Sequence, residues 1–137
     1  MAITTVNEWV KKNNLRLRAV AQTAVQDMAK DVQTPRAKGG RLPVDTGFLR
    51  NSFSSALNSI PRGQSQQSPG FRATDFDMAP IAATLLRLRV GDRVTLGWTA
   101  NYAPYMESRY GFLRLTVQNW QQYVNRAARK VAREYML

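Results

Sequence analysis

The amino-acid sequence predicts a single α+β domain, residues 1–137, in which long N-terminal and C-terminal helices pack on a small antiparallel β-sheet and long flexible loops join the elements. Near both ends of the chain, apolar residues recur at spacings of three and four, as on one face of a helix. Between these ends, residues 94–98 alternate apolar and polar side chains, as in a strand. A chain of 137 residues has room for one hydrophobic core but not for two.

The N-terminal segment has the pattern of a long helix. Thr5 and Glu8 have the spacing of a capping box, in which each side chain binds a free backbone amide of the first turn. Pro35 lacks an amide proton and cannot continue a helix, so we expect the helix to end near Gln33. Its apolar stripe is formed by Val6, Val10, Leu17, Val20, Ala24, Met28 and Val32.

The C-terminal segment is the most periodic part of the chain and predicts one long amphipathic helix. Its apolar positions are Leu113, Val117, Trp120, Val124, Ala127, Val131 and Tyr135. Basic residues recur at the same spacings on another face of this helix.

Turn and strand signals fill the middle of the chain. Asp45 can bind backbone amides ahead of it and Gly47 permits a left-handed turn, so we expect a turn followed by an extended stretch over Phe48–Leu57. Residues 77–90 fit either a helix or one arm of a hairpin, and we favour a helix capped by Asp77 that ends near Leu86.

Two segments, residues 35–43 and 58–74, are rich in Gly, Pro, Ser and Gln and predict flexible loops. Residues 94–98 predict a strand that places Trp98 at its end.

The composition excludes several kinds of chemistry. The chain has no cysteine and no histidine, which removes disulfides, the commonest metal ligand and the usual base of nucleophilic hydrolysis. Asp75 and Asp77 are better explained as residues at a helix entry than as a catalytic pair. No glycine-rich phosphate loop precedes a helix. We therefore expect no catalytic, cofactor-binding or metal site, and a protein that is not an enzyme.

The net charge is +11, from 20 Lys and Arg against 9 Asp and Glu. Such a surface attracts nucleic acid, acidic membranes or acidic proteins without choosing among them, and it also keeps a chain in solution. The apolar runs are too short to cross a bilayer, and the first twelve residues lack the apolar core of a signal peptide. We therefore expect no membrane partner, and the absence of cysteine fits a reducing cytoplasm.

Seven basic side chains are candidates for facing DNA or a protein partner. No helix-turn-helix, zinc-finger or RNA-recognition motif accompanies them, and an arginine-rich helix face is commonly only its solvated side. Nonspecific contact with DNA phosphates remains open, whereas sequence-specific reading is disfavoured. The seven are Arg36, Lys38 and Arg41 in the first loop and Arg126, Arg129, Lys130 and Arg133 in the last helix.

The segment "VTLGWTANYAPYMESRYGF", residues 94–112, is unusually rich in aromatic rings. We expect Trp98 and Phe112 to belong to the core of the monomer. Tyrosine, tryptophan and arginine most often anchor protein interfaces, so the remaining side chains of this connector predict a subunit contact. The predicted contact comprises Tyr102, Tyr105 and Tyr110, with Glu107 and its neutralising partner Arg109.

Four motifs in one order carry a resemblance to a known family. The stretches "VDTGFLRNSF", "RVTLGW", "NYAPYMESRYG" and "FLRLTVQNWQQYVNRAARK" resemble the head–tail neck and tail-completion proteins of tailed bacteriophages, the gene-product-ten-like or minor-tail-protein-Z-like family. The match spans Val44 to about Lys130. The glycine usual soon after the glutamate is displaced here, in "ESRYG", and residues 58–74 have no counterpart.

The resemblance implies a structural virion protein, made in the cytoplasm of a host bacterium, that forms a homo-oligomeric, sixfold ring at the head–tail junction. Its implied partners are the phage neck, connector and tail-tube proteins, with nonspecific contact to packaged DNA in the channel. The tail terminator of the same assembly is the alternative within this class, and a free nonspecific DNA-binding module is the alternative outside it.

Overall fold

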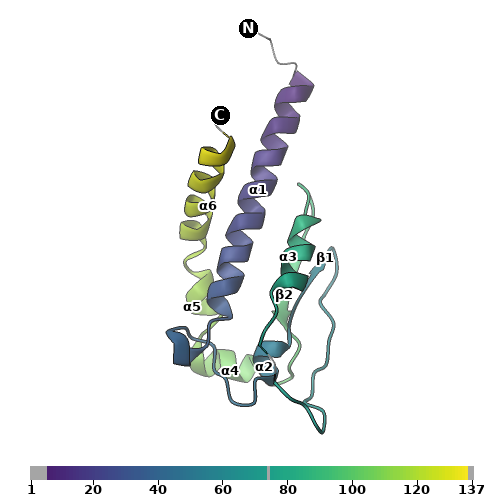
Figure 1. Ribbon diagram of the computed structural model, residues 1–137, viewed down its shortest axis with the longest axis vertical. Helices are drawn as coiled ribbons and strands as arrows, with labels where there is room; N and C mark the ends of the chain where they lie inside the picture. The colour runs from purple at the N-terminus through teal and green to yellow at the C-terminus, as the bar shows by residue number, and fades with distance from the viewer. Residues whose placement is uncertain (1–5, 74, 136–137) are drawn as a thin grey trace.

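The computed structural model describes residues 6–73 and 75–135 and shows the predicted α+β architecture (Figure 1). Helix α1 runs along the molecule, with α5 and α6 on one side of it and α3 with the sheet on the other, and α2 and α4 lie near the base. In chain order the elements are α1 (Val6–Val32), the 3-10 turn η1 (Arg36–Lys38), α2 (Phe48–Asn51), β1 (Phe53–Leu57), α3 (Ala79–Leu86), β2 (Val94–Trp98), α4 (Ala103–Tyr110), α5 (Arg114–Val117) and α6 (Trp120–Tyr135).

The sheet consists of β1 and β2, which pair antiparallel with Phe53 opposite Trp98 and Leu57 opposite Val94. Two strands alone are marginally stable in water, so the sheet depends on what packs against it. Helix α3 packs on β1, where the hydroxyl of Ser55 donates to that of Thr84 at 2.8 Å. The C-terminal half of α1 shares one core with both strands, and α6 packs along α1.

Helix α1 ends at Val32, close to the predicted end. Its buried face comprises Ala24, Val25, Ala29 and Val32, whereas Leu17 is 58% exposed and does not belong to the buried stripe. Thr5 of the predicted capping box lies outside the described residues.

Residues 35–43 form a more ordered loop than the sequence predicts. The amide of Arg36 donates to the Leu42 carbonyl at 3.0 Å, and the Leu42 amide donates to the Thr34 carbonyl at 3.2 Å. The Leu42 side chain is fully buried in the core, while Arg36 and Lys38 stay exposed. Burial of the Leu42 side chain therefore anchors residues 35–43, a segment whose composition predicts a flexible loop.

The turn at Gly47 is confirmed, but the extended stretch predicted to follow begins later. Gly47 has φ 86°, in the left-handed region, and an added Cβ would lie 2.7 Å from the Cβ of Ala73. The first residues after it form the single helical turn α2, and the amide of Phe48 donates to the hydroxyl of Thr46 at 3.3 Å. Thr46, rather than Asp45, therefore supplies the side-chain oxygen that accepts from a backbone amide in this turn.

The helix favoured for residues 77–90 is confirmed as α3, with Pro80 in its first turn. The carboxylate of Asp77 accepts from the Ala79 amide at 2.9 Å. At the other end the side-chain amide of Gln22, on α1, donates to the Leu85 carbonyl at 2.7 Å, and this carbonyl also accepts from the Leu88 amide at 3.1 Å, so α1 is tied to the last turn of α3. The turn at Asp92 then leads directly into β2.

Residues 58–73 form an irregular loop, as predicted, that is tethered to the domain. The amide of Asn101 donates to the Ser65 carbonyl at 2.7 Å, and the Thr99 hydroxyl donates to the Gln64 carbonyl at 2.8 Å. The ring of Phe71 meets that of Phe48 edge-on at 5.3 Å. Thr74, at the end of the predicted loop, lies outside the described residues.

The single C-terminal helix predicted from Leu113 onward is wrong, because the chain breaks into α5 and α6 at Gln118 and Asn119. The amide of Asn119 donates to the Thr116 carbonyl three residues back, and the Gln122 amide likewise donates to the Asn119 carbonyl. The side-chain amide of Asn119 also donates to the Leu115 carbonyl at 3.4 Å, and asparagine side chains that compete for backbone groups favour helix boundaries over helix interiors.

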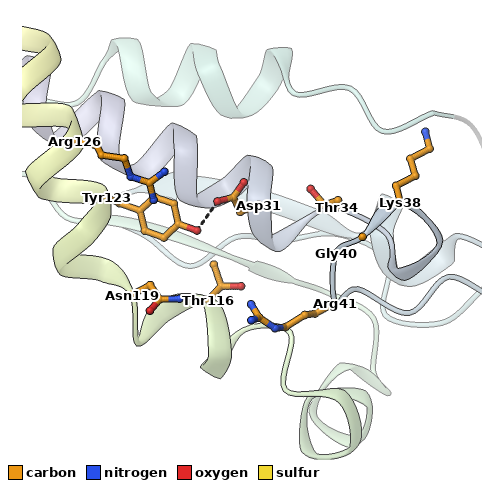
Figure 2. A pocket seen from close by; sticks show the side chains of 10 residues that line it. Asp31, Thr34, Lys38, Gly40, Arg41, Thr116, Asn119, Tyr123 and Arg126 are labelled. Atoms are coloured by element: carbon orange, nitrogen blue, oxygen red, sulfur yellow. Dashed lines mark hydrogen bonds between the residues drawn. The ribbon is translucent and has the colours of Figure 1, made fainter.

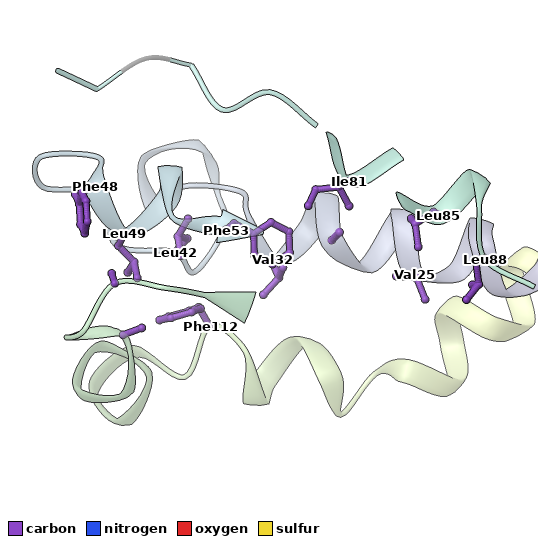
Figure 3. Close-up of a cluster of buried hydrophobic side chains, with 13 residues drawn as sticks. Val25, Val32, Leu42, Phe48, Leu49, Phe53, Ile81, Leu85, Leu88 and Phe112 are labelled. Carbon is purple, nitrogen blue, oxygen red and sulfur yellow. The ribbon is translucent and has the colours of Figure 1, made fainter. Parts of the chain in front are cut away.

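The core lies between α1, α3 and the sheet and continues to the base of the molecule (Figure 3). Phe112 is 1% exposed and meets Trp98 edge-on at 4.8 Å, and Trp98 in turn contacts Phe53. The indole of Trp98 donates to the side-chain oxygen of Gln33 at 2.8 Å. The side-chain amide of Gln33 donates to the Arg50 carbonyl, and the Gln33 carbonyl accepts from Nε of Arg50, both at 2.9 Å. The core therefore carries a satisfied polar residue beside its largest rings.

Candidate functional site

The central part of the aromatic connector, residues 94–112, forms a helix. Residues after Thr99 turn into α4, with Pro104 in its first turn, and Gly111 ends it in the left-handed region at φ 64°. Trp98 and Phe112, on either side of α4, are core residues as predicted. The displaced glycine of "ESRYG" thus has a definite role, since its amide donates to the Glu107 carbonyl at 2.8 Å and terminates α4.

Two of the three tyrosines predicted to be exposed are half-buried. Tyr102 packs on the core beside Phe48, with ring centroids 6.3 Å apart, and burial raises the pKa of its phenol. Tyr110 also packs on the core, and the guanidinium of Arg36 lies 4.6 Å from its ring centroid. Tyr102 is the N-cap residue of α4, and Tyr105 and Tyr110 are five residues apart, a spacing that places them on different faces of this helix.

Tyr105 is the exposed tyrosine of the three, with 62% of its surface accessible. Its hydroxyl raises the pKa of Arg109, which is one turn further along the helix. Tyr105 and Arg109 form an exposed pair on α4, and the guanidinium of Arg109 also lies 5.6 Å from the ring centroid of Tyr110.

Glu107 has a structural partner that the sequence did not reveal. Its two carboxylate oxygens accept from the amides of Leu113 and Arg114, at 2.8 and 2.9 Å. Glu107 therefore joins α4 to the first turn of α5 as a cap. Arg109, which the sequence named as its neutralising partner, contacts Tyr105 and Tyr110.

The break after α5 exposes apolar side chains that the sequence assigned to the core. Leu113, at the start of α5, Val117, at its end, and Trp120, the first residue of α6, are 41%, 42% and 39% exposed. We call these three residues the α5–α6 apolar face. In α6 the buried residues are Tyr123, Ala127 and Val131, and Thr116 is buried in α5. Ala127 and Val131 belong to the predicted apolar stripe, whereas Thr116 and Tyr123 do not.

The seven predicted basic residues separate into three groups. Arg36 stacks on Tyr110, as described above, and Arg129, Lys130 and Arg133 are exposed along α6. The remaining three come together around one open pocket of about 560 Å³ (Figure 2). We call it the basic pocket; it is lined by Asp31, Thr34, Lys38, Gly39, Gly40, Arg41, Thr116, Asn119, Tyr123 and Arg126.

An acidic and phenolic pair forms one wall of the basic pocket. The hydroxyl of Tyr123 donates to the carboxylate of Asp31 at 2.5 Å, and the guanidinium of Arg126 lies 4.9 Å from the Tyr123 ring centroid. Burial, followed by the bond to Asp31, raises the pKa of Tyr123 to about 12, while the positive charges of Arg126 and Arg41 act in the opposite direction. Because Lys38, Arg41 and Arg126 line the pocket together with the single carboxylate of Asp31, its net charge is positive.

Several carboxylates have structural roles. Asp77 caps α3, Glu107 caps α5, and Asp92 accepts from the Arg89 amide, which lowers the pKa of its carboxyl. Among the described residues, no three Asp or Glu side chains gather in a way that could hold a metal ion. None of the described helices combines the length and apolarity that crossing a bilayer requires.

Known proteins add nothing to this picture. No protein-family model matches the chain, and neither the curated proteins nor the solved structures contain a match.

Proposed function

We propose that this chain is a structural protein of the head–tail junction of a tailed bacteriophage, a non-catalytic component of a neck or tail-completion ring. The observation that carries the proposal is the α5–α6 apolar face. Several exposed large apolar side chains in one short segment are typical of a surface that another protein covers. Tryptophan at such a surface is among the residues that contribute most to binding.

The order of the sequence motifs supports the same assignment. The "VDTG" stretch forms the turn at Gly47, "RVTLGW" forms β2, and "NYAPYMESRYG" forms α4. These segments meet around Phe48, Trp98 and Phe112 at the base of the molecule. The motifs that resemble the phage family therefore form one packed unit, and α4 and α5 project Tyr105 and the α5–α6 apolar face from it.

In a ring, the α5–α6 apolar face and the Tyr105–Arg109 pair would contact neighbouring subunits or the adjoining connector and tail proteins. The exposed basic residues of α6 would face packaged DNA or an acidic neighbour. The tail terminator of the same assembly would use the same features and remains the second candidate.

The mass of the purified protein, alone and mixed with isolated phage heads and tails, tests the proposal. We expect Trp120→Ser to abolish the ring or its attachment, because it removes the largest side chain of the apolar face. Leu86→Ser is the matched control, since Leu86 is 67% exposed on α3 and lies outside that face. A wild-type protein that stays monomeric with every virion component would overturn the proposal. If Trp120→Ser assembled as well as wild type, the α5–α6 apolar face would not be the contact surface.

A further inference from the structure

The basic pocket joins residues that are far apart in the sequence. Thr34 follows α1, Lys38 to Arg41 belong to the loop after it, and Thr116 to Arg126 belong to α5 and α6. The loop is fixed at its base because Leu42 is buried and bonds to Thr34 through its backbone amide. Gly40 is required there, since an added Cβ would lie 2.0 Å from the Thr34 carbonyl oxygen.

The charges around the pocket are unbalanced. Among the lining residues three are cations, Lys38, Arg41 and Arg126, and one is a carboxylate, Asp31. The Tyr123 hydroxyl already donates to this carboxylate. In the described part of the chain, no hydrogen bond or ion pair ties the guanidinium of Arg41 to another residue.

The side chains are arranged to receive a group from outside. In Figure 2, Arg41 and Arg126 approach the Asp31–Tyr123 pair from different sides, and Lys38 extends at the rim. The ring of Tyr123 supports Arg126, whose Nε also donates weakly to the Gln122 carbonyl at 3.4 Å. Two guanidinium groups on separate walls can donate to several oxygens of one anion at once.

We propose that the basic pocket binds a phosphate group. A tetrahedral phosphate presents oxygens in several directions, which suits donors on separate walls better than the two coplanar oxygens of a carboxylate. Its double negative charge matches the excess of cations. The pocket volume of about 560 Å³ exceeds that of a single ion, so the phosphate can be free or carried by a nucleotide or a DNA backbone. This inference does not depend on the proposed role in a ring.

Titration of the full-length protein with inorganic phosphate at constant ionic strength tests the proposal, with sodium chloride as the reference. The readout is the shift of the Gly40 amide in two-dimensional NMR spectra. We expect a saturable shift, and we expect Arg41→Gln to weaken phosphate binding about tenfold by removing one charge-assisted donor. Arg129→Gln is the matched control, because Arg129 is exposed on α6 outside the pocket, and it should change the affinity little.

Asp31→Asn supplies a test in the opposite direction. Asparagine can still accept from the Tyr123 hydroxyl but carries no negative charge, so the affinity for phosphate should rise about fivefold. A variant that is merely misfolded cannot produce such a gain.

Two further titrations identify the source of the phosphate. Displacement of bound phosphate by a short DNA duplex, sensitive to Arg41→Gln, indicates a backbone phosphate, whereas displacement by a nucleoside monophosphate alone indicates a small ligand. The proposal is overturned if phosphate gives no more shift than chloride. It is equally overturned if Arg41→Gln and Arg129→Gln weaken binding to the same extent.

Discussion

Replacing Glu107 by alanine is expected to lower the stability of the monomer, because this residue caps α5. Its two oxygens accept from the amides of Leu113 and Arg114 at 2.8 and 2.9 Å. Loss of a capping side chain costs up to about 2 kcal/mol, and each charge-assisted bond contributes about 1.5 kcal/mol or more before water replaces it. We therefore expect Glu107→Ala to cost about 2 kcal/mol of unfolding free energy. Glu107→Gln, which keeps one accepting oxygen, should cost about 1 kcal/mol.

Thermal unfolding followed by circular dichroism measures this loss. A 137-residue chain has an unfolding entropy of about 0.29 kcal/mol/K, so these costs correspond to decreases in Tm of about 7 °C and about 3.5 °C. Glu134→Ala is the control, because an acidic residue in the last turn of α6 opposes the helix dipole and its removal should be neutral or mildly stabilising.

An unchanged Tm for Glu107→Ala would refute the capping role. If that variant also failed to assemble, the residue would instead belong to the subunit contact that the sequence suggested. The experiment therefore separates a role within the monomer from a role between monomers.

Three further predictions concern pH, a glycine turn and the exposed tyrosine. The folded pKa of Tyr123, about 12, exceeds its ordinary value of 10.0, so the stabilisation from this phenol is complete below pH 10 and is lost as the pH rises toward 12. The midpoint of urea unfolding should therefore fall more steeply with pH for wild type than for Tyr123→Phe. Parallel pH curves for the two proteins would contradict this. Gly47→Ala should cost about 1–3 kcal/mol in urea unfolding, because of its φ of 86° and the 2.7 Å approach to Ala73. Gly70→Ala, with φ 80° but open space around it, should cost less, and equal losses would show that the contact is irrelevant. Tyr105→Ala should change the unfolding free energy by no more than about 0.5 kcal/mol, since the phenol is 62% exposed, yet reduce the joining of heads to tails; wild-type phage yield would reject its role in the interface.

Several elements followed from local chemistry and were predicted correctly. Pro35 ends α1, Asp77 caps α3, and the alternation of residues 94–98 gives β2. In each of these cases the signal lies within a few residues of the feature, because capping, proline sterics and strand alternation act over one or two turns.

The candidate sites depended on longer distances. The sequence named Lys38, Arg41 and Arg126 as partner-facing, but nothing in it indicated that they surround one pocket. Their juxtaposition depends on the packing of α6 along α1, which brings together residues about ninety positions apart, as the bond from Tyr123 to Asp31 illustrates. Side chains this far apart in the chain meet only after the core has formed.

The sequence by itself determined the α+β class, the positions of the long helices and the strand, and the excess of positive charge, since these follow from periodicity and composition. Only the tertiary structure decided where the C-terminal helix breaks and which side chains near the break face solvent. The predicted stripe is buried at Ala127 and Val131, but Trp120, directly after the break, is 39% exposed, and Tyr123, outside the stripe, is buried. Periodicity defines a helix face, but packing against α1 selects the face that is buried.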